Sequence, residues 1–208
     1  EKKEWNLGVD YSFFEGRLYG KFDYYRREVD NLLFSVKVPQ PPYTQGSQMQ
    51  NIGSMESKGW EFEVGGDIIR TKDFTWSSSM NLSHNTGKIL TLEGDNSYHN
   101  GNGFVAPGTP GDAARMEAGS TIGSFYMWKF AGFDDEGSFL LYNKDGEVIP
   151  AAQKTENDKQ YIGNYTPKLI IGWSHTLTYK NFDLGINLRS WIDFDVYNTC
   201  LLYTSPSP

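Results

Sequence analysis

The stretch HTLTYKNFDLGINL, residues 175–188, alternates apolar and polar side chains on both sides of a Lys-Asn pair. Leu177 and Tyr179 fall on one face of the first half, and Phe182 and Leu184 fall on one face of the second. Because successive side chains of a β-strand point to opposite sides, this pattern predicts a β-hairpin with one apolar face. The function of the hairpin depends on what covers that face.

The same alternation occurs in six segments, at residues 5–13, 18–25, 60–68, 74–83, 169–179 and 182–191. Their more apolar face has 30 positions and no Asp, Glu, Lys or Arg, whereas the opposite face has 27 positions and eight of them. Charged residues make up 22% of the chain, so chance placement would put several on the first face. Either the core of a soluble β-sandwich or the hydrocarbon of a membrane would exclude them.

The connections between these segments alternate in length. Short links join the segments in pairs, and long ones, about residues 35–58 and 84–167, separate the pairs. Such asymmetry is typical of an outer-membrane β-barrel, which has short periplasmic turns and large extracellular loops. Aromatic residues beside the short links would form a girdle at the lipid headgroups: Phe13, Phe14, Phe74, Trp76, Tyr179 and Phe182. The sequence therefore predicts an all-β fold, a partial antiparallel transmembrane barrel with a small loop hairpin at 138–150.

The polar face of the segments would then line the barrel lumen. Its charged candidates for this role are Asp10, Asp23, Glu61, Glu63, Asp67, Asp183 and Arg189. Glu61 and Glu63 lie one strand repeat apart, as a catalytic carboxylate pair could, but a solvated lumen wall explains them better. His175 falls on the proposed lipid face, where a neutral side chain near the interface is expected rather than a metal ligand.

Composition argues against several classes of function. The net charge is −7 and there is no Lys/Arg cluster, so no nucleic-acid partner is expected. No apolar stretch approaches the length of about 18 residues that a membrane helix needs. The histidines His84, His99 and His175 are far apart and Cys200 is the only cysteine. Without a catalytic constellation or metal-ligand spacing, no enzyme activity, metal or cofactor is expected.

The second long connection contains the best candidates for substrate contact. Tyr126, Trp128 and Phe130, in SFYMWKFAGF at 124–133, would share one face of an extended strand. Aromatic rings have large apolar faces, which can stack on sugars or on peptide side chains. Local packing within the loop is the alternative interpretation, and the favoured one.

Three motifs follow one another along the chain: N-x-G before S-x-G-x-E in NIGSMESKGWEFEVGG (51–66), G-N-x-T-P-K (163–168), and the hairpin Y-K-N-F-D-L (179–184). In these motifs, in their order and over nearly all of residues 1–198, the chain resembles the C-terminal barrel region of TonB-dependent transporters of the SusC/RagA type. Members of that family are outer-membrane importers with a plug inside a wide barrel.

The resemblance implies an outer-membrane location and import of oligosaccharides or peptides. It also implies two protein partners, the TonB complex, which acts through the plug region, and a surface SusD-like lipoprotein that captures substrate. The plug, the TonB box and the final barrel strands have no counterpart here, so residues 1–199 are expected to be part of a barrel. Residues 200–208, CLLYTSPSP, are similar to a translated sequencing adapter and are expected to be a non-native tail.

Two other functions stay open on the sequence. One is a soluble β-rich carbohydrate-binding or adhesin module, which would need another protein layer over Trp60, Leu184 and Ile186. The other is a passive porin, which would need neither a plug nor a TonB box.

Overall fold

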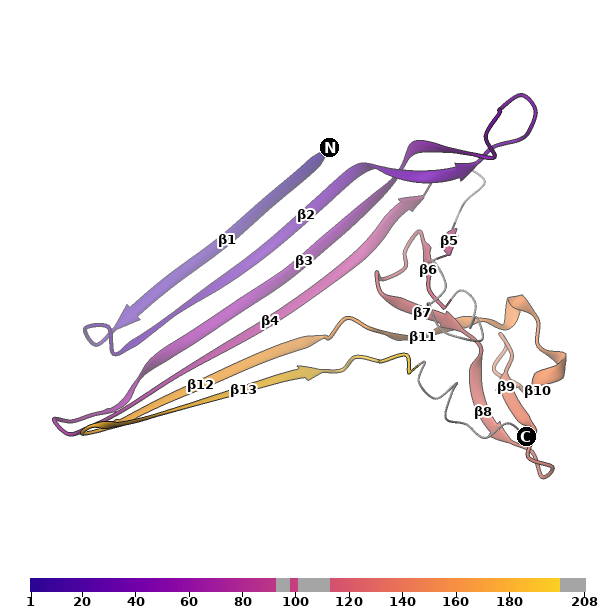
Figure 1. Ribbon diagram of the computed structural model, residues 1–208. Coiled ribbons are helices and arrows are strands. Elements are labelled where there is room, and N and C mark those ends of the chain that lie inside the picture. Colours follow the sequence, from indigo (N-terminus) through magenta and orange to yellow (C-terminus); the bar gives the residue numbers. More distant parts are fainter. Residues whose placement is uncertain (93–97, 101–112, 199–208) are drawn as a thin grey trace.

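The computed structural model describes residues 1–92, 98–100 and 113–198, so the expected tail, 200–208, lies outside the described residues. Its main feature is one antiparallel sheet with the strand order β1-β2-β3-β4-β12-β13. The short turns lie at one end of this sheet, and the smaller strands gather at the other end (Figure 1). The six strands are β1 (Lys2–Phe13), β2 (Leu18–Lys37), β3 (Ser47–Arg70), β4 (Phe74–Leu92), β12 (Leu169–Tyr179) and β13 (Phe182–Ile192).

The connection between β4 and β12 has short strands of its own, which pair as β10-β9-β8, β11-β7 and β5-β6. The β9–β10 hairpin confirms the one predicted at 138–150. No helix among the described residues is long and apolar enough to cross a membrane. The short elements are β5 (Tyr98–Asn100), β6 (Arg115–Glu117), β7 (Ser124–Met127), β8 (Lys129–Phe133), β9 (Phe139–Tyr142), β10 (Val148–Pro150), β11 (Gln160–Asn164), and the 3-10 helices η1 (Ala151–Gln153) and η2 (Glu156–Asp158).

β2 and β3 are much longer than the alternating segments that predicted them. Residues 35–58, expected as a long connection, are strand except for 38–46, and β4 likewise continues to Leu92. Charged side chains in the extension interrupt the apolar alternation, but the strands stay paired there, with register shifts after Val29 and Ser54. Some direct cross-strand partners have opposite charge, which stabilises their pairing. Arg27, for example, forms an ion pair with Glu4 across β1 and β2, with Nη2 2.8 Å from Oε1.

The register places the two faces of the sheet as the alternation predicts. Direct cross-strand partners share a face. Leu7, Tyr24, Trp60 and His84 form one such row across β1, β2, β3 and β4. The aromatic and aliphatic side chains of the separate segments therefore merge into one continuous apolar face.

No other element of the described chain covers this apolar face. Leu184 and Ile186 are 56% and 41% exposed, and the ring of Trp60 lies beside His84 of the neighbouring strand β4, with centroids 6.1 Å apart. The buried apolar side chains of the described chain lie instead at the outer end of β4 and in the connection beyond it: Ile89, Ala113, Phe125 and Leu141. A soluble sheet buries one face against a second layer, and this sheet has none. The architecture is that of an open arc of barrel wall rather than a soluble sandwich.

Candidate functional site

The polar face of the sheet carries the charged residues that the sequence assigns to a lumen. Asp10, Lys21 and Glu63 are direct partners across β1, β2 and β3, and Lys21 Nζ lies 3.7 Å from Glu63 Oε2. In a neighbouring row Asp23 stands directly opposite Glu61. Like charges in direct opposition destabilise a sheet, and the high dielectric constant of water weakens their repulsion. The row therefore fits a face that is open to water.

A hollow of about 710 Å³ lies over this polar face, bounded by residues of β2, β3, β4, β12 and β13. Lys21, Glu61, Glu63 and Arg189 line it, so charges of both signs share one space. Between them lie side chains that can donate and accept hydrogen bonds: Ser79, Asn81, Ser83, Ser174 and Asn187. The arrangement can solvate and guide a polar solute along the sheet.

The other lumen candidates lie outside this hollow. Asp67 sits near the turn end of β3, where its carboxylate accepts hydrogen bonds from Ser77 Oγ at 2.7 Å and Arg70 Nη1 at 3.4 Å. Asp183 stands opposite Thr178, one pair from the β12–β13 turn. Asp10 and Asp23 are on the polar face of β1 and β2, beside the hollow rather than in it.

The aromatic segment 124–133 is not one continuous strand, contrary to the sequence prediction. β7 pairs with β11 and β8 pairs with β9, and Trp128 lies at the change from one sheet to the other. Tyr126, Trp128 and Phe130 therefore have three separate surroundings. The alternation of residue types could not show this change, because it depends on which distant strand supplies the ladder at each point.

Tyr126 packs within the loop. Its ring centroid lies 5.1 Å from that of Tyr161, and the Arg115 guanidinium carbon lies 4.3 Å from the Tyr126 ring centre. Burial raises the pKa of Tyr161 to about 12, and a hydrogen bond to Glu117 adds to the effect. The phenol of Tyr161 therefore stays neutral at physiological pH and links β11 to Glu117 of β6, while its ring packs on Tyr126 of β7.

Trp128 is held by the loop that follows β10. Its indole Nε1 donates a hydrogen bond to the Thr155 carbonyl at 2.8 Å. The Nζ atoms of Lys154 and Lys159 each lie 4.4 Å from the Trp128 ring centroid. Both contacts have cation–π geometry, so they fix the ring in the loop.

Phe130 has a more accessible setting, together with two residues that the sequence reasoning missed. The side chains of Phe130, Phe133 and Phe139 are 51%, 60% and 59% exposed, and their rings lie in mutual contact. The ladder shifts register between Phe130 and Gly132, and Gly132 has a φ of 136°. This bulge brings Phe130 and Phe133 to one side, whereas strict alternation would separate residues three apart. Exposed aromatic residues at a loop surface are candidates for ligand contact.

A second polar hollow, of about 420 Å³, lies where the outer ends of β4 and β13 meet the loops. Asn164 closes one side: its backbone N–H donates to Asp195 Oδ2 at 2.9 Å, and its Nδ2 donates to the Ile122 carbonyl at 3.1 Å. Asp193 accepts a hydrogen bond from Lys168 Nζ at 2.6 Å and raises the pKa of Lys168. Sequence reasoning missed this hollow because its lining comes from segments far apart in the chain.

Comparison with known proteins shows the family to which this chain belongs. A family model described as TonB dependent receptor-like, beta-barrel, matches residues 3–198. The chain belongs to this TonB-dependent receptor family. TonB-dependent receptor P3 of Formosa agariphila is 33% identical over 96% of the chain and 21% of its own length. TonB-dependent receptor SusC of Bacteroides thetaiotaomicron is 32% identical over 93% and 19%.

The solved structures agree with the family. The structure of the RagAB peptide importer in the open-open state matches with a TM-score of 0.76 at 26% identity, covering 93% of the chain and 20% of that protein chain. The structure of the RagAB peptide transporter matches with a TM-score of 0.74. The resemblance to the SusC/RagA type is thereby confirmed. This TonB-dependent receptor segment spans about a fifth of the length of the curated relatives it matches.

The names of these relatives describe receptors and importers rather than enzymes. Within the ranges of the receptor segment that the structure describes, no group of three or more His, Cys, Asp or Glu residues could hold a metal ion. His175, on the apolar face, instead accepts a hydrogen bond at Nδ1 from Trp76 Nε1, at 3.3 Å.

Proposed function

We propose that this receptor segment forms part of the wall of an outer-membrane importer that uses TonB energy to take up oligomeric nutrients, either glycans or peptides. The observation that carries the proposal is a single-layer sheet, apolar and uncovered on one face and charged on the other, in a chain that belongs to the TonB-dependent receptors. In lipid, such a sheet satisfies its backbone by ladder hydrogen bonds and exposes only its apolar face.

Each face has its own role in this proposal. The apolar face contacts the bilayer of the outer membrane. The polar face, with Asp10, Asp23, Glu61, Glu63, Asp67, Asp183 and Arg189, lines the path of the substrate. The hollow over it offers hydrogen-bonding groups and mixed charge, which suit the hydroxyls of a glycan or the backbone of a peptide.

The loop end of the sheet contacts substrate outside the membrane. Phe130 carries this role best among the residues singled out in the sequence, because Tyr126 and Trp128 are engaged in loop packing. A SusD-like lipoprotein delivers the substrate to this end, and the TonB complex acts on a plug within the complete receptor. The segment itself performs no enzymatic step and needs no cofactor.

Uptake by the full-length receptor tests the proposal. A strain that lacks the receptor gene is complemented with wild type or with a version whose TonB box is deleted, and uptake of fluorescent glycan oligomers and fluorescent oligopeptides is measured. We expect one of the two probe classes to enter only with the wild-type gene. Equal uptake without the TonB box would indicate a passive porin, and recovery of the receptor in the soluble fraction would exclude an importer.

A further inference from the structure

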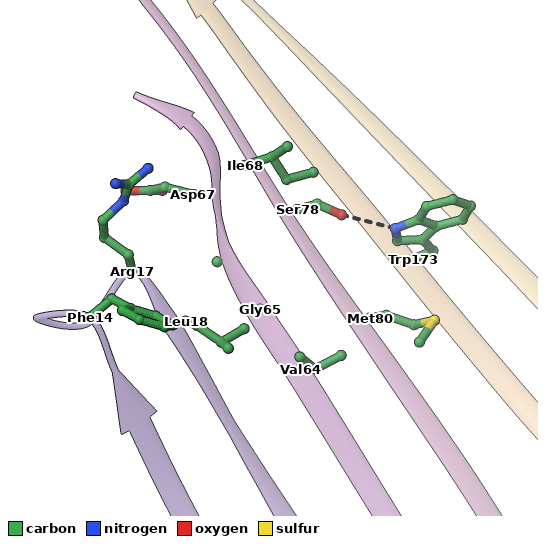
Figure 2. Close-up of a pocket in the computed structure, with 11 residues that line it drawn as sticks. Phe14, Arg17, Leu18, Val64, Gly65, Asp67, Ile68, Ser78, Met80 and Trp173 are labelled. Atoms are coloured by element: carbon green, nitrogen blue, oxygen red, sulfur yellow. Dashed lines mark hydrogen bonds between the residues drawn. The ribbon is translucent and has the colours of Figure 1, made fainter. Parts of the chain in front are cut away.

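A hollow of about 530 Å³ opens on the apolar face near the short turns. It arises from two small residues in one cross-strand row: Gly66 lies between Leu18 and Ser78, and Ser78 lies between Gly66 and His175. Larger side chains surround this depression, as Figure 2 shows: Phe14, Leu18, Val64, Ile68, Met80 and Trp173. Its volume falls in the range of about 300 to 1,000 Å³ that is typical of small-molecule sites.

A β-bulge forms one wall of the hollow. Asp67 pairs with Ser77 and Ile69 pairs with Trp76, which leaves Ile68 as the extra residue of β3. Alternation from Gly66 already places Ile68 on the apolar face, where it lines the hollow and is 50% exposed; the shift pairs Ile69 with Trp76 on the same face. A bulge re-aims side chains at the end of a strand. The wall of the hollow at the end of β3 is therefore apolar.

The interior of the hollow is apolar. The two polar side chains that reach it from β4 and β12 satisfy each other, because Trp173 Nε1 donates a hydrogen bond to Ser78 Oγ at 2.9 Å (Figure 2). A hydrocarbon chain could fill this space without leaving either group unpaired. A polar ligand would find few hydrogen-bonding partners there.

The rim of the hollow carries one guanidinium, of Arg17, and one carboxylate, of Asp67. Arg17, in the β1–β2 turn, lines it, and in the part of the chain that the structure describes no carboxylate forms an ion pair with Arg17. Asp67, the last polar-face residue of β3 before the bulge, also borders the hollow, and its carboxylate accepts hydrogen bonds from Ser77 and Arg70 rather than from Arg17. Lys72 and Lys180 lie in the other two short turns, outside the lining of the hollow. A guanidinium can bind a phosphate group, and the apolar hollow beside it can hold a hydrocarbon chain attached to that phosphate.

We propose that this hollow binds one phospholipid of the periplasmic leaflet, with an acyl chain over Gly66 and Ser78 and the lipid phosphate on Arg17. The site rests on the proposed membrane placement of the segment, because only a hydrocarbon-facing surface presents the hollow to lipid. Binding forms no covalent bond. It anchors the turn end of β2 and β3 at the level of the headgroups.

Native mass spectrometry of the full-length receptor, released from nanodiscs of phosphatidylethanolamine and phosphatidylglycerol, tests the site. Wild type should keep one phospholipid under activation that strips the rest. Arg17→Gln removes the phosphate contact and should lower lipid retention about tenfold, the effect of one charge-assisted hydrogen bond. Val64→Phe fills the hollow and should also lower lipid retention, by excluding the acyl chain. The controls lie outside the hollow. Lys180→Gln matches Arg17→Gln in charge, Leu184→Phe matches Val64→Phe in the added ring, and both should retain lipid as wild type does.

Heat-modifiable migration reports folding of each variant, and uptake of the probe imported by wild type reports function. The lipid site is overturned if the wild-type receptor folds and imports but keeps no phospholipid. It is also overturned if all four variants keep phospholipid equally. Either outcome leaves the import proposal standing. If Val64→Phe does not fold, unchanged retention by Arg17→Gln alone overturns the site. A receptor that does not insert into lipid overturns the import proposal and this site with it.

Discussion

Tyr25 lies across Gly59, its direct cross-strand partner: a Cβ placed on Gly59 would come within 2.6 Å of the Tyr25 phenolic oxygen. The same relationship links Tyr19 to Gly65. Glycine weakens a strand because it has no side chain to pack, and an aromatic ring laid over it restores the packing. The long strands β2 and β3 are therefore fastened by tyrosine rings that need their partner to be glycine.

Gly59→Ala should lower the free energy of unfolding by about 1 to 3 kcal/mol, because the added methyl overpacks against the Tyr25 ring and the His84 carbonyl. Gly185→Ala is the matched control, since no atom lies within 4 Å of a Cβ at Gly185. Its effect should stay within about 0.5 kcal/mol. Urea unfolding of the full-length receptor in lipid vesicles measures both. Equal midpoints for the two variants would contradict the role of the ring.

Leu184 and Asn187 lie on opposite faces of β13, so arginine at each position distinguishes lipid from lumen. Leu184→Arg should destabilise the folded receptor by about 1 to 3 kcal/mol, between the costs at the headgroups and at the bilayer midplane, because Phe182 lies at the headgroup level one repeat away. Asn187→Arg should have much less effect. Folding into lipid vesicles at increasing urea measures the difference. Equal tolerance of both substitutions would mean that the faces are wrongly assigned.

Glu4 and Arg27 give the outer end of β1 and β2 a pH dependence. The Arg27 hydrogen bonds, helped by Lys2, lower the pKa of Glu4 from 4.5 to about 2. A lowered carboxyl pKa contributes stability that is fully present above pH 4.5 and is lost as the pH falls towards 2. Arg27→Gln should therefore be less stable than wild type at pH 7, and the difference should shrink towards pH 2. Unfolding midpoints across this range measure it, and a constant difference would rule out the linkage.

Phe133 should matter for uptake because it forms the exposed ring cluster with Phe130 and Phe139. Phe133→Ser removes a stacking surface, and we expect half-maximal uptake to need several-fold more substrate. Phe133→Tyr keeps the ring and should behave as wild type does. Concentration-dependent uptake of whichever probe the receptor imports measures both. A Phe133→Ser receptor with unchanged uptake would assign the cluster to packing of the loop alone.

The sequence predicted best where side-chain alternation alone decides the structure. β12 and β13 have the bounds that alternation implied, with an outer residue added at Ile192, because every second residue from Leu169 onwards meets one environment. The sequence prediction failed where β2 and β3 continue beyond their alternating segments. There, charged pairs such as Arg27 and Glu4 belong to the strand ladder without following the alternation of apolar and polar residues. The loop site was only partly predictable, since the bulge beside Gly132 decides which side Phe133 occupies.

Asp158 joins the loop after β10 to the β9–β10 hairpin. Its Oδ2 accepts hydrogen bonds from the Thr155 N–H and hydroxyl, both at 2.7 Å, and its Oδ1 accepts one from the Lys144 N–H at 3.3 Å. The two bonds from Thr155 contribute most to lowering the pKa of Asp158. Asp158→Ala removes all three hydrogen bonds, so amides 151–159 should exchange hydrogen about tenfold faster while global unfolding changes little. Glu156→Ala removes only the ion pair of the exposed Glu156 carboxylate with Lys159, which keeps its contact with Trp128, and should leave exchange nearly unchanged. Hydrogen exchange read by mass spectrometry on the full-length receptor separates the two variants, and equal protection in both would show that Asp158 does not fasten the loop.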